Sequence, residues 1–183
     1  MTSPFRTKVS RALADAWRPH DWFQLNQQVE AHYYNKACVC ADFRPRRVVE
    51  IGTRCGYSLV SFALACPDAQ YLCFDGAVDD DSLDCLQHWQ SVVERWAIDA
   101  QLVVVDMAHV RSLPRADFAH VDGDHSYGGA LRDLRLAGHC PTILADDTDN
   151  GQVRQAVEEF VAERRRSVDW INDGLRECAV ITA

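Results

Sequence analysis

The 183-residue sequence predicts an α/β fold in which a doubly wound, mostly parallel sheet ends in an antiparallel hairpin. Short β-branched or apolar runs alternate with segments whose apolar residues recur at helical spacing. Five of the runs end at a glycine or an aspartate, where a strand is expected to turn into a loop. Alternation of this kind is typical of a parallel sheet with helices on both faces.

The first part of the chain supplies an extension and the first two strands. Residues 1–45 contain many aromatic side chains and no glycine, and we expect a helical N-terminal extension there. RRVVEIG (46–52) predicts the first strand and GYSLVSFALA (56–65) the helix after it. AQYLCFD (69–75) predicts the second strand, followed by a helix over 80–98.

The remaining segments complete a Rossmann-like sheet. Further strands are expected at 101–106, 116–122 and 141–146, and further helices at 126–138 and 150–165. SVDWIND and LRECAVITA, separated near Gly174, predict the closing hairpin and bring the total to seven strands. We therefore expect one domain over residues 1–183, with its Rossmann-like core at 46–183.

Composition excludes several classes of protein. The net charge of −8 argues against nucleic acid or an anionic membrane as partner. No apolar run approaches the roughly 20 residues needed to cross a bilayer, and the N-terminus lacks the apolar core of a secretory signal. The eight cysteines contain no CxxC pair, so we expect reduced structural thiols in a cytoplasmic protein.

The predicted strand ends carry polar residues that a ligand could use. In open α/β sheets, ligands bind outside the carboxyl ends of the strands. Gly52 and Gly56 allow a tight turn after the first strand, and the helix that follows offers free N–H groups to an anion. Acids stand at or beside every strand end: Glu50, Asp75, Asp106, Asp122, Asp124, Asp146 and Asp147. Aspartate is common in turns, but acids at all five ends favour a site.

The glycine turn indicates the kind of ligand. A dinucleotide site needs GxGxxG, and Arg54 stands where the middle glycine would approach a pyrophosphate. A ligand with a ribose, an adenine and an amino-acid carboxylate, but no pyrophosphate, fits better. S-adenosylmethionine is such a ligand.

Four motifs in order extend this interpretation. VVEIGTRCGYS, CFD, HVDGDHSYGGALRDL and ILADDT resemble the class I S-adenosylmethionine-dependent methyltransferases. The closest resemblance is to the small metal-dependent O-methyltransferases of the catechol, caffeoyl-CoA and antibiotic-sugar types, and it covers residues 46–182. It implies a methyltransferase (EC 2.1.1) that contacts its cofactor through Glu50, Gly52, Thr53, Gly56, Tyr57, Ser58, Asp75 and Asp106.

The resemblance also implies roles within that set. Ser58 would contact the methionine carboxylate, with Gly52 and Thr53 nearby. Asp75 would bind the ribose hydroxyls, and Asp106 would lie on the adenine side.

A metal is the second implied ligand. The resemblance makes Asp122, Asp146 and Asp147 its ligands, and they end two strands that are adjacent in this topology. Converging carboxylates repel one another unless a cation lies between them, and oxygen ligands favour Mg²⁺, or else Mn²⁺ or Ca²⁺. For the general base, the antibiotic-sugar enzymes offer the second acid of their DGD motif, and the matching residue here is Asp124. The catechol enzymes have a lysine where this chain has His125. Both residues stay candidates.

These observations favour a Mg²⁺-dependent O-methyltransferase acting on a small vicinal diol, either a sugar or a catechol. The first alternative is a module that binds S-adenosylmethionine without catalysis. The second is a phosphoryl-transfer or receiver protein that uses Asp146 and Asp147 for Mg²⁺; it needs a lysine near the acids, and Lys8 and Lys36 both precede the sheet.

The N-terminal aromatic residues are expected to pack against the core. A second interpretation places some of them over the substrate mouth or in a dimer contact. They are Trp17, Trp22, Phe23, Tyr33 and Tyr34. The chain is short, with little sequence for a substrate lid, and a homodimer is a further expectation.

Overall fold

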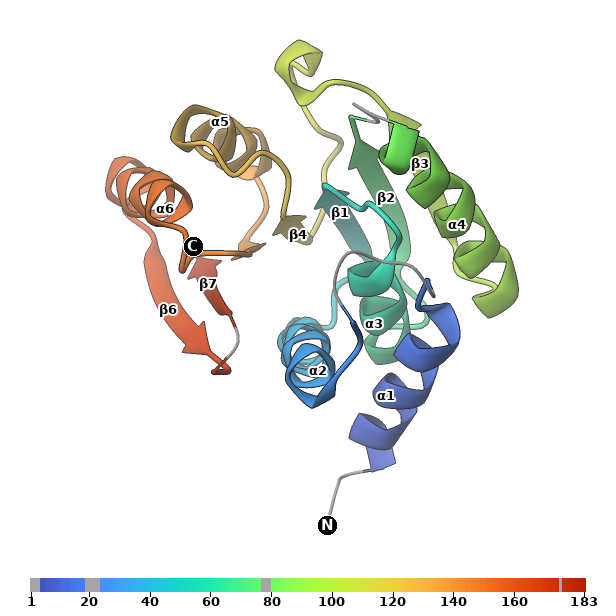
Figure 1. The fold of residues 1–183 in the computed structure, drawn as a ribbon. Helices are drawn as coiled ribbons and strands as arrows, with labels where there is room; N and C mark the ends of the chain where they lie inside the picture. The colour runs from blue at the N-terminus through green and yellow to red at the C-terminus, as the bar shows by residue number, and fades with distance from the viewer. Residues whose placement is uncertain (1–3, 19–23, 77–79, 175) are drawn as a thin grey trace.

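A seven-stranded sheet with helices on both faces organises the chain (Figure 1). The structure is a computed structural model that describes residues 4–18, 24–76, 80–174 and 176–183. The strand order is β3-β2-β1-β4-β5-β7-β6, in which only β7 runs against its neighbours. The predicted doubly wound, mostly parallel sheet with a C-terminal antiparallel hairpin is confirmed.

The elements of the first half follow the predicted order. Two helices precede the sheet, and two strand–helix units follow. Their bounds are α1 Pro4–Ala16, α2 Gln27–Phe43, β1 Arg47–Ile51, α3 Tyr57–Ala65, β2 Gln70–Asp75 and α4 Asp80–Trp96. The α2 helix begins after Asn26, whose side-chain oxygen accepts hydrogen bonds from the backbone N–H groups of Gln28 and Val29.

The second half adds the remaining strands and one element that the sequence did not indicate. The expected elements are β3 Ala100–Val104, β4 Phe118–Val121, α5 Tyr127–Ala137, β5 Thr142–Ala145, α6 Gly151–Arg164, β6 Ser167–Asn172 and β7 Glu177–Thr182. A short 3-10 helix, Met107–His109, forms after β3 because the Asp106 side chain accepts a hydrogen bond from the backbone N–H of Ala108. None of the helices within the described residues is long and apolar enough to cross a membrane.

The parallel strands bring their carboxyl ends to one edge. The β1 strand lies between β2 and β4, with Ile51 opposite Phe74 on one side and Val121 on the other. The β4 strand continues this register to β5, where Val121 lies opposite Ala145. The residues directly after β1, β2, β4 and β5 therefore meet in space although they are far apart in sequence.

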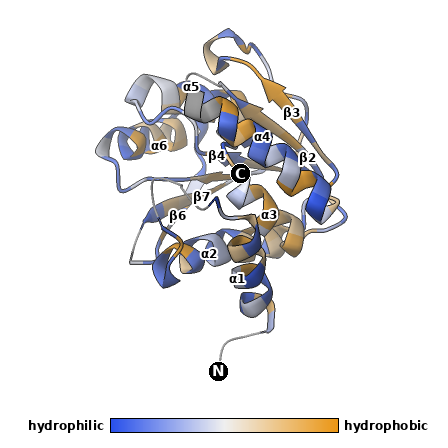
Figure 2. Cartoon of the chain, turned by 45° about the vertical axis from the view of Figure 1, so that its right-hand side comes forward, coloured by the Kyte–Doolittle hydropathy of each residue, from blue (hydrophilic) through white to orange (hydrophobic). Residues whose placement is uncertain are grey.

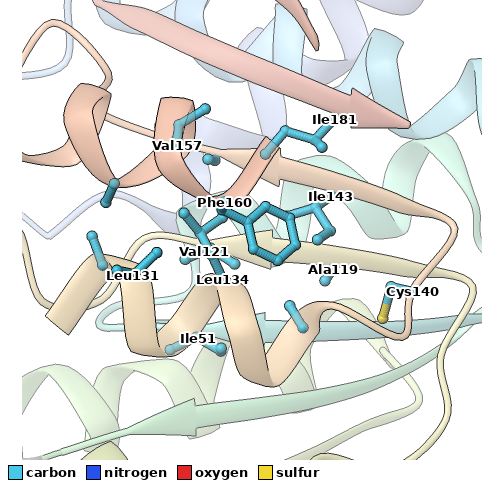
Figure 3. Close-up of a cluster of buried hydrophobic side chains, with 14 of the residues drawn as sticks. Ile51, Ala119, Val121, Leu131, Leu134, Cys140, Ile143, Val157, Phe160 and Ile181 are labelled. Carbon is cyan, nitrogen blue, oxygen red and sulfur yellow. The ribbon is translucent and has the colours of Figure 1, made fainter. Parts of the chain in front are cut away.

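Two apolar layers hold the sheet in place. On one face, α5 and α6 lie side by side and cover a cluster in which Phe160 packs with Val121, Leu134 and Ile143 (Figure 3). On the other face, α3 and α4 bury Phe62 and Trp89 against the strands.

The N-terminal helices pack on this second face. The α1 and α2 helices pack on α3 through a third apolar cluster. Hydrophobic and hydrophilic residues alternate along α4, as expected for a helix that buries only one side (Figure 2). This packing places α2 beside the edge where the strand ends meet.

Candidate active site

A cavity of about 710 Å³ opens at the carboxyl edge of the sheet. This volume lies within the range of small-molecule sites. Most of the predicted site residues line it: Gly52, Thr53, Tyr57, Ser58, Asp75, Asp106, Asp122, Asp124, His125, Asp146 and Asp147. Glu50 and Gly56 do not line it.

The turn after β1 depends on two glycines with positive φ. Gly52 has φ +82°, and a Cβ there would lie 1.9 Å from the backbone oxygen of Asp122. The β1 and β4 backbones can approach this closely only because position 52 carries no side chain. Gly56, also at φ +82°, begins α3 beside the Trp89 ring. The N-terminus of α3 is thereby directed toward the cavity.

Glu50 lies under this turn and supports it. Its carboxylate is 1% exposed, accepts a hydrogen bond from Thr53 Oγ1 at 2.7 Å and lies 3.0 Å from His120 Nδ1. Trp89 Nε1 donates to Thr53 Oγ1 from the other side at 2.9 Å. The structure therefore places Glu50 among buried partners behind the cavity wall.

The cavity wall beside β2 and β3 carries the other two acids. Asp75 Oδ2 accepts a hydrogen bond from the backbone N–H of Arg54 at 2.8 Å, which ties the end of β2 to the glycine turn. Asp106 is exposed and has His109 3.4 Å away. Both acids line the cavity, and their strands lie on the other side of β1 from β5, which precedes Asp146 and Asp147.

Aromatic side chains of the N-terminal segment pack around Tyr57, which lines the cavity. The Trp17 ring stacks on Tyr57 at 4.1 Å, and Tyr33 contacts both rings edge to face. Tyr33 also lines the cavity, and a place over the substrate mouth stays a prediction for it. Trp22 and Phe23 lie outside the described residues.

Two of the predicted metal ligands meet at His125. His125 Nε2 lies 3.5 Å from Asp122 Oδ1 and 3.4 Å from Asp147 Oδ2, and the three donor atoms lie within 4.8 Å of one another. Asp147 adopts a left-handed backbone conformation with φ 51°. Burial and the neighbouring Asp122 and Asp146 raise the pKa of Asp147 to about 6. The hydrogen bond to Asp122 raises the pKa of His125. Negative charge is in excess at this corner.

The third predicted ligand, Asp146, faces α2 instead. Lys36 Nζ forms a close ion pair with Asp146 Oδ2, and His32 Nε2 lies 3.3 Å from the same oxygen. Cys178 Sγ donates to Asp146 Oδ1 at 2.9 Å. Burial would raise the pKa of Asp146, but the Lys36 ammonium and the hydrogen bond with His32 hold this pKa well below its usual range. Asp146 is therefore a buried anion with its own partners.

Lys36 corrects one inference from the sequence. Both lysines precede the sheet, and from this position in the chain we expect neither of them near the acids. The packing of α2 on α3 instead brings Lys36 Nζ to 3.5 Å from Asp122 Oδ2 and 3.2 Å from Ser58 Oγ. The order of residues along the chain did not predict this proximity.

The two candidate bases differ in their surroundings. Asp124 Oδ1 accepts a hydrogen bond from the backbone N–H of Ser126 at 2.9 Å, and this bond lowers the pKa of Asp124. His125 is 46% exposed in its side chain and lies against both Asp122 and Asp147. Asp124 thus stabilises the turn into α5, whereas His125 faces the acids.

Some of the described site residues were not predicted from the sequence: His32, Lys36, His120 and Arg176. Arg176 Nη1 lies 3.0 Å from Asp147 Oδ1 and reaches the corner from the C-terminal hairpin. His32 and Lys36 stand four residues apart and so share one face of α2. That spacing was the available signal. A basic face on an N-terminal helix is more often solvated than buried.

Comparisons with known proteins identify the family and the fold. The profile of a family described as a methyltransferase domain matches residues 49–148, more than half of the chain. No curated protein sequence matches.

Several solved structures share the fold. The S-adenosylhomocysteine-bound Podospora anserina methyltransferase PaMTH1 has 14% identity and a TM-score of 0.67, over 100% of this chain and 89% of that one. The O-methyltransferase TomG from Streptomyces achromogenes, in complex with S-adenosylmethionine, has 14% identity and a TM-score of 0.64, over 100% and 91%. The Bacillus cereus O-methyltransferase in complex with S-adenosylhomocysteine has 16% identity and a TM-score of 0.65, over 100% and 92%. The chain therefore belongs to the methyltransferase-domain family, and it has the fold of these class I S-adenosylmethionine-dependent methyltransferases.

Proposed function

We propose that this methyltransferase transfers the methyl group of S-adenosylmethionine to a hydroxyl of a small vicinal diol, a sugar or a catechol. A divalent cation such as Mg²⁺ would assist the transfer. The observation that carries the proposal is the acid corner formed by Asp122 and Asp147, which opens into the same cavity as the glycine turn. O-methyltransferases among the structures that share the fold support the choice of a hydroxyl.

The cofactor fits the wall made by β1 and β2. Ser58 and the backbone N–H groups at the start of α3 are suited to the methionine carboxylate. Asp75 would accept hydrogen bonds from the ribose hydroxyls, and Asp106 would lie on the adenine side, since both acids line the cavity. Gly52 lines the cavity without a side chain, so the cofactor could approach the backbone of this turn closely.

The cation fits the corner at the end of β4 and β5. Asp122 and Asp147 present oxygen atoms at adjacent strand ends, and their excess negative charge favours a hard divalent ion. A cation held there would bind two neighbouring hydroxyls and make the attacking one more acidic. Asp122 and Asp147 would fix the diol by this means, and the cavity would orient it toward the cofactor wall.

His125 is the general base that the geometry favours over Asp124. Its Nε2 lies beside the two acids that would hold the diol, so a hydroxyl bound there would be within its reach. The carboxylate of Asp124 accepts a backbone hydrogen bond, which makes it a weaker base. We propose that His125 Nε2 takes the proton of the attacking hydroxyl.

Two further properties belong to this proposal. All eight cysteines are free thiols, which supports a cytoplasmic location. A homodimer stays a prediction, which sedimentation velocity would test.

The test is turnover of labelled S-adenosylmethionine on a panel of catechols and sugar diols, with and without EDTA. We expect methylation that EDTA abolishes and Mg²⁺ restores, and an Asp147→Asn variant that loses most of its turnover. Asp149→Asn, an exposed acid two residues along, is the matched control and should keep its activity. Turnover that survives EDTA would refute the cation, and no turnover on any diol would refute the substrate class.

A further inference from the structure

The ammonium of Lys36 lies against two metal-type donors, the carboxylates of Asp146 and Asp122. The side chain is 2% exposed and reaches from α2 to Asp146 and Asp122. The Tyr33 ring lies 5.2 Å from the same Nζ, a cation–π contact. Nothing in the family match extends to α2, because that match begins at residue 49.

His120 adds a third donor of the metal-binding type beside Asp122 and Asp146. It is fully buried, Glu50 lies against its Nδ1, and its Nε2 has no hydrogen-bond partner in the described part of the chain. That Nε2 lies 4.0 Å from Asp122 Oδ2 and, with Asp122 and Asp146, forms a group whose donor atoms lie within 4.8 Å. A histidine held by a carboxylate on one nitrogen and open on the other is the usual arrangement of a metal ligand.

Both carboxylate oxygens of Asp146 already have partners within the protein. Its Oδ2 is shared by Lys36 and His32, and its Oδ1 accepts from Cys178. His32 is itself fixed by Asp173 at 2.9 Å on its other nitrogen. The side chains of Asp122 and Asp147 are more exposed, at 24% and 13%, and both line the cavity.

We propose that Lys36 is a positioning residue that serves as a built-in cation, filling the position framed by His120, Asp122 and Asp146. It thereby withholds Asp146 from the divalent cation, which is held by Asp122 and Asp147 alone. This inference rests on the proposed function, because it specifies how that cation is bound. It also predicts that the cation binds weakly and exchanges readily. The positive charges of Lys36 and Arg176 already offset the charges of Asp146 and Asp147, two of the three carboxylates.

The test is calorimetric titration of Mg²⁺ and Mn²⁺ into the protein without substrate. Lys36→Met removes one positive charge beside the acids and frees Asp146, so cation affinity should rise at least about tenfold. Lys36→Arg keeps the charge and should stay within about threefold of the wild type. Lys8→Met changes the other lysine, which is exposed, and is the matched control.

Variants of the acids test which carboxylates hold the cation. Asp147→Asn should weaken cation binding by more than about tenfold, whereas Asp146→Asn should change it by less than about threefold. Equal losses in these two variants, or a Lys36→Met variant that binds the cation no more tightly than the wild type, would overturn the inference. Titration of S-adenosylhomocysteine into each variant checks that the cofactor site is intact.

A wild-type protein that binds the cofactor but no cation would refute the cation of the proposed function. In that case the Lys36→Met variant still tests the inference. If this variant binds the cation, Lys36 acts as a built-in cation; if it binds no cation, the inference is overturned. If Lys36→Met does not fold, lysine-labelled wild type replaces it, because the chain has only two lysines. The buried ammonium protons of Lys36 should stay visible by NMR in saturating Mg²⁺, and their loss would show displacement and overturn the inference.

Discussion

Replacing Gly52 with alanine is the sharpest test of how the fold builds the site. The new Cβ would lie 1.9 Å from the Asp122 oxygen, whereas Cβ atoms are essentially never found closer than 3.0 Å to a neighbouring heavy atom. The neighbour is the backbone that follows β4, so the two chain segments must separate by about 1 Å. The positive φ adds its own strain.

The size of the effect follows from these two contributions. A left-handed alanine costs about 1–2 kcal/mol, and forcing closely packed groups apart costs about 1–3 kcal/mol more. We expect Gly52→Ala to lower the free energy of unfolding by about 2–5 kcal/mol. The displaced segment begins with Asp122, so cation binding should weaken as well.

Two other glycines separate the contributions. Gly174 has φ +86°, and a Cβ added there meets none of the described atoms within 4 Å, so Gly174→Ala measures the backbone strain alone, about 1–2 kcal/mol. Gly128 lies in α5 with open space around it, and Gly128→Ala should be neutral or stabilising by up to about 1 kcal/mol. Urea denaturation compares the midpoints at constant m-value. A Gly52→Ala loss no larger than that of Gly174→Ala would refute the close-approach argument.

Three further variants test other parts of the site. Because folding raises the pKa of Asp147 to about 6, ionisation of this carboxyl destabilises the fold; the effect begins above about pH 4 and is complete above about pH 6. In the absence of divalent cations, Asp147→Asn should therefore be about 1–3 kcal/mol more stable than the wild type at pH 7. Below about pH 4 the two proteins should be equally stable. Equal thermal stability at both pH values would contradict this. Asn26→Ala removes the cap of α2 and should cost about 1 kcal/mol in urea denaturation, whereas an unchanged midpoint would show that the cap is dispensable. Glu50→Gln weakens the hydrogen-bond acceptor for Thr53 and His120 and should lower the free energy of unfolding by about 1–3 kcal/mol in urea denaturation. An unchanged midpoint would contradict this role of Glu50.

The order of the elements and one edge of the site could be predicted from local sequence patterns. Strand and helix periods are local properties, so the alternation of short apolar runs with helical patterns predicted β1 to β7 and the helices between them. Acids such as Asp75, Asp122 and Asp147 stand at or just after the ends of parallel strands, and parallel strands end at the same edge. Their meeting in one cavity therefore followed from topology.

The direction of Glu50 needed the structure. The last four residues of β1 are buried, so the strand shows no alternation of apolar and polar side chains. Without that alternation, the pattern does not tell which face Glu50 occupies. Only the neighbouring β4, which supplies His120, decided that Glu50 lies beneath the turn.

Tertiary packing alone decided that Asp146 is held by Lys36 and His32. Nothing local marks a lysine of an N-terminal helix as buried, since lysine is normally solvated. It becomes buried here because α2 packs on α3 and directs its basic face at the strand ends, where buried carboxylates offset the loss of hydration. Such a contact joins distant parts of the chain, and it depends on how one helix is rotated against another.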